Sequence, residues 1–127
     1  MKLIRFIVST VILLVVATAD AGELRPFDQV AFDKLVKEGQ PIVIAVHASW
    51  CPTCKAQKPI QTTLMARPEF KTYTLFTLDF DTDTTLLKTF KVIKQSTIVV
   101  FKGPTEVGRS IGDTNLESMA ALMRKAG

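Results

Sequence analysis

The stretch Trp50-Cys51-Pro52-Thr53-Cys54 holds both cysteines of this chain of 127 residues. Two thiols separated by two residues can close a small disulfide ring when a helix begins at the first of them. The first sulfur then lies at the helix N-terminus, where the helix macrodipole favours the thiolate. A thiolate is the nucleophile of thiol–disulfide exchange. The spacing therefore predicts a redox-active pair at the start of a helix.

Two other uses of the cysteine pair stay open. A structural disulfide stabilises a fold most when it closes a long loop, and this one would enclose only Pro52 and Thr53. A structural zinc site usually takes four ligands, whereas the chain offers Cys51, Cys54 and a single histidine, His47. The redox interpretation is favoured, with a metal half-site and a purely structural disulfide as alternatives.

The N-terminus has the pattern of a secretory signal peptide. Lys2 and Arg5 precede an almost wholly apolar stretch, residues 6–17, and Ala19-Asp20-Ala21 has the small-x-small form of a cleavage site. We expect cleavage after Ala21, so that 1–21 is a signal peptide and 22–127 is one domain in the periplasm. The alternative is a retained inner-membrane anchor that faces the periplasm. The apolar stretch is shorter than the ~20 residues that a spanning helix needs.

Charge and composition place few constraints on the partner. The chain has 16 basic and 12 acidic residues and a net charge of +4, with Lys and Arg scattered along it. A charge this modest supports solubility and does not indicate nucleic-acid binding. We expect a single compact domain that is a monomer.

Periodicity and turn signals outline alternating helices and strands. Asp83 is a suitable helix N-cap, Thr114 and Glu117 form a capping box, and Pro59 predicts a kink within its helix. This order, with a final pair of strands joined by a tight turn, predicts a three-layer α/β domain with a mixed sheet. The expected helices cover about residues 31–38, 51–65, 83–90 and the segment after 114, and the expected strands cover 42–46, 73–80, 97–101 and 107–111.

Several of these segments resemble the thioredoxin family. Residues 48–55 resemble its active-site motif, and Pro59 falls where that family kinks its active-site helix. Phe101-Lys102-Gly103 resembles the turn after its central strand, and Gly112 its late glycine. The resemblance covers nearly all of residues 22–127. It implies an α/β thioredoxin-like three-layer sandwich, with a mixed central sheet flanked by helices, and neither a cofactor nor a metal.

The resemblance also implies roles for the motif residues. Cys51 is expected to attack and Cys54 to resolve the mixed disulfide. Cys51 should be the more exposed cysteine, with its pKa lowered from ~8.5 toward ~3.5–7.5, and Cys54 the more buried one. Trp50 is expected to shield one side and to offer substrate an apolar contact. Pro52-Thr53 is similar to the dipeptide of the exported thioredoxin-like reductants of cytochrome c maturation.

One departure from the family lies far from the motif in sequence. The family usually has a cis-proline before its central strand, and alignment places Ser96 there, next to Thr97. Ser96 and Thr97, like Pro52 and Thr53 of the motif, are expected to bind substrate or to tune the cysteine pair. A cis bond without proline costs ~2.5–4 kcal/mol, so we expect a trans Gln95–Ser96 bond. We also expect Ser96 within contact range of the cysteines, its hydroxyl near the Cys51 sulfur. Ser96→Pro is then expected to change redox rate more than stability.

Other departures concern proton transfer. The family's buried aspartate aligns with Ala45, and the lysine that often accompanies it aligns with Thr77. Proton transfer at Cys54 would then need water or another group. His47 stands four residues before Cys51, so it is a candidate for that transfer or for tuning the thiolate, and otherwise a structural strand-end residue.

The sequence thus predicts an exported thiol–disulfide oxidoreductase. Its partners would be protein thiols or disulfides, with the reductive direction favoured. An exported reductant needs reducing equivalents, which implies a membrane electron donor. The alternative is a non-enzymatic metal-binding or chaperone module that uses Cys51, Cys54 and His47.

Overall fold

The computed structural model describes residues 11–14 and 21–127. Most of the expected signal peptide, 1–21, lies outside these described residues, so that it stays a prediction. Within the described part of the chain, no helix combines the length and the apolar character needed to cross a membrane.

The centre of the fold is a five-stranded sheet with the strand order β1-β3-β2-β4-β5. β3 pairs in parallel with β1 and β2, whereas β4 pairs antiparallel with β2 and β5. The mixed sheet expected from the sequence is therefore confirmed, and β2 lies at its middle. The strands are β1 (Glu23–Pro26), β2 (Pro41–His47), β3 (Thr74–Asp79), β4 (Thr97–Lys102) and β5 (Thr105–Ile111).

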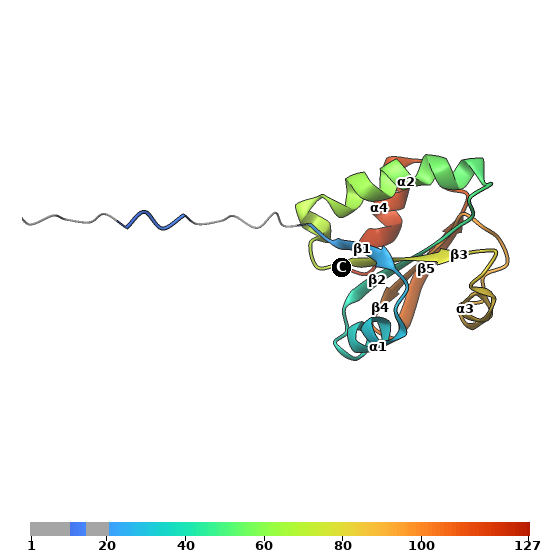
Figure 1. Cartoon of the computed structure of the whole chain (residues 1–127), viewed down its shortest axis with the longest axis horizontal. Helices are drawn as coiled ribbons and strands as arrows, with labels where there is room; N and C mark the ends of the chain where they lie inside the picture. Colours follow the sequence, from blue (N-terminus) through green and yellow to red (C-terminus); the bar gives the residue numbers. More distant parts are fainter. Residues whose placement is uncertain (1–10, 15–20) are drawn as a thin grey trace, which may run out of the picture.

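Helices cover both faces of this sheet, which gives the expected three layers. In Figure 1, α2 and α4 lie above the sheet and α1 and α3 lie below it. Helices on both faces explain why β2 is an almost continuous apolar run, because neither of its faces meets water. The helices are α1 (Gln29–Lys37), α2 (Pro52–Met65), the short 3₁₀ helix η1 (Pro68–Phe70), α3 (Thr84–Thr89) and α4 (Leu116–Arg124).

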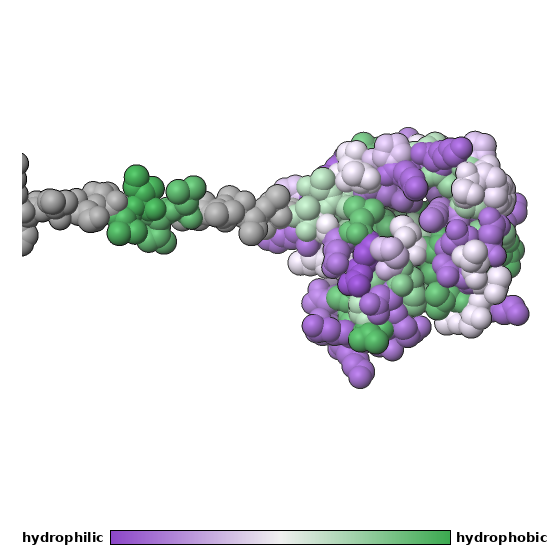
Figure 2. All heavy atoms as spheres, viewed as in Figure 1, coloured by the Kyte–Doolittle hydropathy of each residue, from purple (hydrophilic) through white to green (hydrophobic). Residues whose placement is uncertain are grey.

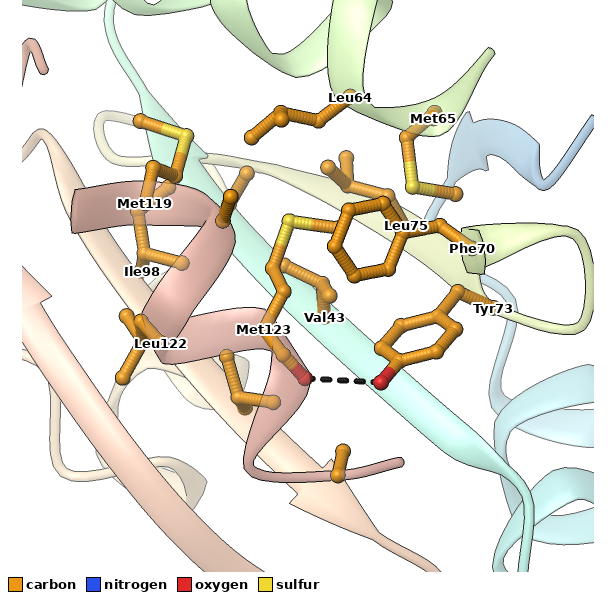
Figure 3. Close-up of a cluster of buried hydrophobic side chains, with 14 residues drawn as sticks. Val43, Leu64, Met65, Phe70, Tyr73, Leu75, Ile98, Met119, Leu122 and Met123 are labelled. Atoms are coloured by element: carbon orange, nitrogen blue, oxygen red, sulfur yellow. Dashed lines mark hydrogen bonds between the residues drawn. The ribbon is translucent and has the colours of Figure 1, made fainter. Parts of the chain in front are cut away.

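The sheet separates two apolar cores. One lies between the sheet and α2 and α4, where the buried Tyr73 hydroxyl donates to the backbone oxygen of Met123 at 2.9 Å (Figure 3). The other lies on the α1 and α3 side and is rich in phenylalanine, with Phe32 and Phe90 in edge-to-face contact at 5.4 Å. Methionines of α4 belong to the first core, as their helical spacing indicates: Met119 and Met123.

Two elements, β1 and η1, were not predicted from the sequence, and one helix cap differs from the prediction. Asn115, not Thr114, caps α4, because its side chain accepts a hydrogen bond from Ser118 N at 2.9 Å. Asp83 does stand at the N-cap of α3, but its carboxylate accepts from Asp79 N at 2.7 Å instead of from the helix.

On the face in Figure 2, hydrophilic side chains are spread among hydrophobic ones, in keeping with the scattered charge.

Candidate active site

The cysteine pair lies where β2 gives way to α2. Cys51 is the N-cap of α2, with Pro52 at its first turn, a position where proline's missing N–H is not needed. The Cys51 sulfur accepts a hydrogen bond from Cys54 N at 3.1 Å, so it takes the place of a capping oxygen. The two sulfurs form a disulfide, with their Cα atoms 5.3 Å apart. The helix N-terminus predicted from the motif is therefore confirmed.

Both cysteines are buried, which corrects the expectation that Cys51 is the more exposed. Cys51 is 2% exposed and Cys54 is 3% exposed. They pack with Ala48 and the partly buried Phe80 into a small apolar cluster. The sequence could not show this burial, because part of the cover comes from Ser96, 45 residues along the chain.

Ser96 lies against the disulfide, as expected. Its hydroxyl oxygen is 3.2 Å from the sulfur of Cys51 and 3.2 Å from the sulfur of Cys54. The side chain is buried, at 3% exposure. The described residues include no cis peptide bond, so Gln95–Ser96 is trans, also as expected.

The backbone of Ser96 is unusual and explains why proline does not fit. Its φ angle is 62°, in the left-handed region, and its N–H donates to Val46 O at 2.9 Å. Proline fixes φ near −65° and has no N–H. Ser96→Pro is therefore expected to destabilise the fold, contrary to the sequence-based expectation of a mainly kinetic effect.

Gln57 is a site residue that sequence reasoning missed. It lies on α2 with 2% exposure, and its side-chain nitrogen donates to Ser96 O at 3.2 Å and to Asp113 O at 3.0 Å. Ser96 O also accepts from Gly112 N at 3.0 Å. The sequence offers only its position, one turn after Cys54 on the expected helix. The burial that makes hydrogen-bond partners necessary is seen in the structure alone.

The remaining motif residues lie around the pair in different ways. Trp50 is 55% exposed, and its indole N–H donates to Asp81 Oδ2 at 2.8 Å. Pro52 is exposed and Thr53 is half-buried. Thr97 is buried, but its hydroxyl donates to Lys94 O at 2.6 Å, so it serves the loop and not the sulfurs.

His47, the last residue of β2, adjoins the disulfide through shared cavities. It and Cys54 both line a cavity of about 170 Å³ and a second one of about 280 Å³. Ala45 and Thr77 also line the first, where small side chains leave room. The Nε2 atom of His47 is buried and has no hydrogen-bond partner among the described residues. Lys58 borders both cavities and adds positive charge to the surroundings of Cys54.

This arrangement defines a dithiol–disulfide exchange site. A cysteine at a helix N-terminus, a second cysteine one turn later and a neighbouring positive charge all favour the thiolate chemistry of exchange. Residues 11–14 and 21–127 contain no group of three or more His, Cys, Asp or Glu side chains that could hold a metal ion.

Known proteins are similar to this chain in sequence and in fold. The family model described as Thioredoxin matches residues 23–125. The thioredoxin of Chlamydia muridarum is 31% identical over 84 residues, which cover 66% of this chain and 80% of that protein. A bifunctional thioredoxin reductase/thioredoxin of Mycobacterium leprae is 28% identical over 93 residues, 73% of this chain but only 19% of that longer protein.

Among solved structures, Trxlp from Edwardsiella tarda has a TM-score of 0.77 and 34% identity, over 80% of this chain and 98% of that chain. The chain belongs to the thioredoxin family. Family, fold and cysteine pair together make it a thiol–disulfide oxidoreductase.

Proposed function

We propose that this oxidoreductase is exported and reduces disulfides of protein substrates, with Cys51 as the attacking residue. The observation that carries these roles is the position of the Cys51 sulfur at the N-cap of α2, where it accepts the Cys54 N–H at 3.1 Å. Cys54 lies within the first turn of α2, so its sulfur is not at the N-cap. The helix N-terminus therefore stabilises negative charge on Cys51 more than on Cys54.

The reaction balances as two exchanges. The Cys51 thiolate attacks one sulfur of the substrate disulfide, and the other substrate sulfur leaves as a thiolate and takes up a proton. Cys54 then loses its proton and attacks the Cys51 sulfur. The Cys51–Cys54 disulfide forms, the bond from Cys51 to substrate breaks, and the second substrate sulfur leaves as a thiolate. The substrate gains two electrons and the cysteine pair loses two.

Exposed apolar side chains suggest where a protein substrate binds. Trp50 is 55% exposed, Ile93 is 81% exposed and Ile111 is 54% exposed. Trp50 directly precedes Cys51, Ile93 lies in the loop that leads to Ser96, and Ile111 precedes Gly112, which donates to Ser96 O. Trp50 and Ile93 are thus close in sequence to residues at the disulfide, and Ile111 lies opposite Thr97 in the sheet. Such side chains favour an apolar stretch of substrate over a charged one.

Export and direction rest on the sequence. The N-terminal pattern supports export, and the Pro52-Thr53 dipeptide, similar to that of exported reductants, supports the reductive direction. A reductant outside the cytoplasm must be re-reduced, so we propose a membrane protein as its electron donor.

Trapping tests the roles of the two cysteines. Cys54→Ser should attack substrate but fail to release it, so mixed disulfides with exported proteins should accumulate. Cys51→Ser should trap none. Trapping that survives the loss of Cys51 and requires Cys54 would reverse the assignment.

Equilibration with glutathione tests the direction. A potential near −270 mV, as in thioredoxin, would support a reductant, and one near −120 mV would make the protein an oxidant. Export has its own test, because mass spectrometry of the exported protein should show Gly22 as the first residue. Full-length chain in the membrane fraction would support the anchored alternative instead.

A further inference from the structure

The Ser96 hydroxyl is the one polar side-chain group that contacts both sulfurs of the disulfide in the described structure. Neither sulfur of a disulfide carries a proton, so the hydroxyl must be the donor in both contacts. A hydroxyl has one proton and two acceptor lone pairs. In the oxidised protein its single proton is therefore shared between two neutral sulfurs, and its lone pairs receive nothing from them.

Reduction changes what the two sulfurs offer. In the proposed exchange reaction Cys51 acts as a thiolate, which only accepts, and Cys54 as a thiol, which can donate. From the observed position, 3.2 Å from each sulfur, the hydroxyl can donate to Cys51 and accept from Cys54 at the same time. A hydrogen bond to an ionised acceptor is roughly twice as strong as a neutral one. The hydroxyl thus binds the reduced pair better than the oxidised pair.

The hydroxyl is held in this place by its backbone. Ser96 donates its N–H to Val46 O at 2.9 Å, and its carbonyl accepts from Gly112 N at 3.0 Å and from Gln57 Nε2 at 3.2 Å. The φ of 62° is a conformation that non-glycine residues rarely adopt. Uncommon backbone conformations of this kind persist where the surroundings determine them and gather at functional sites.

We infer that Ser96 is a catalytic residue whose hydroxyl stabilises the Cys51 thiolate and makes the cysteine pair easier to reduce. The inference rests on the exchange reaction of this pair and is independent of export and of direction. It also gives this chain a thiolate-stabilising group at the position where its relatives usually have a proline that offers no donor.

Two variants separate the hydroxyl from the backbone. Ser96→Ala removes the oxygen and keeps a side chain at positive φ. Ser96→Gly removes the oxygen and is free to adopt that φ. Thr97→Val is the matched control, because it removes a neighbouring buried hydroxyl that bonds to Lys94 O instead of to sulfur.

The first measurement is the ultraviolet absorbance of the thiolate in the reduced protein as a function of pH. We expect the midpoint of Cys51 ionisation to rise by about one pH unit in both Ser96 variants, a tenfold loss of thiolate below the midpoint. Thr97→Val should keep the midpoint of the parent. An unchanged midpoint in Ser96→Gly would overturn the inference. If the midpoint then rises in Ser96→Ala alone, the effect comes from backbone strain and not from loss of the hydroxyl.

The second measurement is the redox equilibrium with glutathione. Loss of the hydroxyl should lower the equilibrium constant for reduction about tenfold, which corresponds to about 30 mV toward a more reducing pair. An unchanged or raised constant in both variants would also overturn the inference. If the parent protein itself fails to exchange with glutathione, that result contradicts the proposed exchange reaction. Normal exchange by the parent with an unmoved midpoint in the variants contradicts only the role of Ser96.

Discussion

The side-chain amide of Gln57 donates to the backbone oxygen of Ser96 at 3.2 Å and thereby ties α2 to the loop that touches both sulfurs. The same nitrogen donates to Asp113 O at 3.0 Å. One buried side chain therefore joins the helix that carries the cysteines to two loops from the other end of the sequence.

Gln57→Leu should weaken both the fold and the site. It keeps much of the volume but removes the donor to Asp113 O and one of the two donors to Ser96 O, which keeps the bond from Gly112 N. A buried acceptor left without a partner costs about 1–3 kcal/mol. Urea unfolding measures the loss. Gln61→Leu, one turn further along α2 and also buried, is the control, because no side-chain hydrogen bond of Gln61 is found among the described residues. Equal losses in the two variants would mean that the Gln57 bonds contribute nothing specific.

His47→Gln should slow the release step of the reaction. His47 shares two cavities with Cys54, and imidazole is the side chain that ordinarily exchanges protons near neutral pH. An aromatic disulfide releases a coloured thiolate when Cys51 attacks and another when Cys54 resolves the intermediate. We expect a second phase about 100-fold slower at neutral pH, the lower end of general acid–base effects, with the first phase unaltered.

Two results would contradict this role for His47. One is a second phase with the rate and pH profile of the parent. The other is an equal slowing of both phases, which would indicate a general disturbance of the site. The second cavity, which His47 and Cys54 line together, is also lined by three charged residues: Lys55, Lys58 and Asp79. Lys58→Met therefore serves as a comparison that removes a charge without removing the imidazole.

The Glu106–Arg109 ion pair should give stability that acid removes. The hydrogen bond from Arg109 lowers the pKa of the Glu106 carboxyl below its ordinary value of 4.5. Because the pKa of this carboxyl is lower in the folded state than in the unfolded state, the ion pair stabilises the fold at a pH above the unfolded-state pKa. This stability is lost as the pH falls through the folded-state pKa. Glu106→Gln should thus cost less than about 1 kcal/mol at pH 7, since the pair is partly exposed.

The check is urea unfolding of parent and Glu106→Gln at neutral and acidic pH. Their difference in unfolding free energy should shrink as the pH falls below 4.5, the ordinary carboxyl value. Arg109 also donates to Lys91 O at 3.1 Å and to Phe90 O at 3.0 Å, so Arg109→Ala should cost more than Glu106→Gln at both pH values. A difference that persists undiminished in acid would show that the carboxyl acts by packing and not by charge.

Gly22→Ala should destabilise the domain. A Cβ atom at Gly22 would lie 2.6 Å from Phe70 O and 2.9 Å from Tyr73 O, so the backbone would have to shift. Overpacking of this kind typically costs about 1–3 kcal/mol. Glu23→Ala, at the exposed next position, is the control and should lie within about 0.5 kcal/mol of the parent. Thermal unfolding of both variants provides the comparison. Equal unfolding midpoints would show that the backbone at the start of β1 can shift at little cost.

Most of the fold could be predicted because its elements carry local signals. The buried run of β2 and the helical periodicity of α1 and α4 are visible in the sequence, as is the start of α2 at Cys51. β1 was missed because it has only four residues, Glu23–Pro26, of which the last is a proline, too short a run to predict a strand. Only its pairing with β3 makes it a strand.

The site was predicted to the extent that it lies within one segment. The cysteine motif locates the reaction, and alignment to the family brought Ser96 beside it. The burial of Cys51 and the hydrogen bonds of Gln57 could not be predicted from the residues around them. They depend on loops 39 to 56 residues away in sequence, whose positions follow from the antiparallel return of β4 and β5.

The parallel strands β1, β3 and β2 place the N-terminus and the cysteine pair at opposite ends of the sheet. Gly22 donates to Met65 O at 2.8 Å, and β1 then begins opposite Thr74, the first residue of β3. The disulfide follows the opposite end of β2, a strand of seven residues and thus about 20 Å long. Whatever precedes Gly22 is joined to the far pole of the domain. A chain held at its N-terminus would turn the pole that carries the cysteine pair away from the point of attachment, so that a bulky partner could reach this pole as readily as in a released chain.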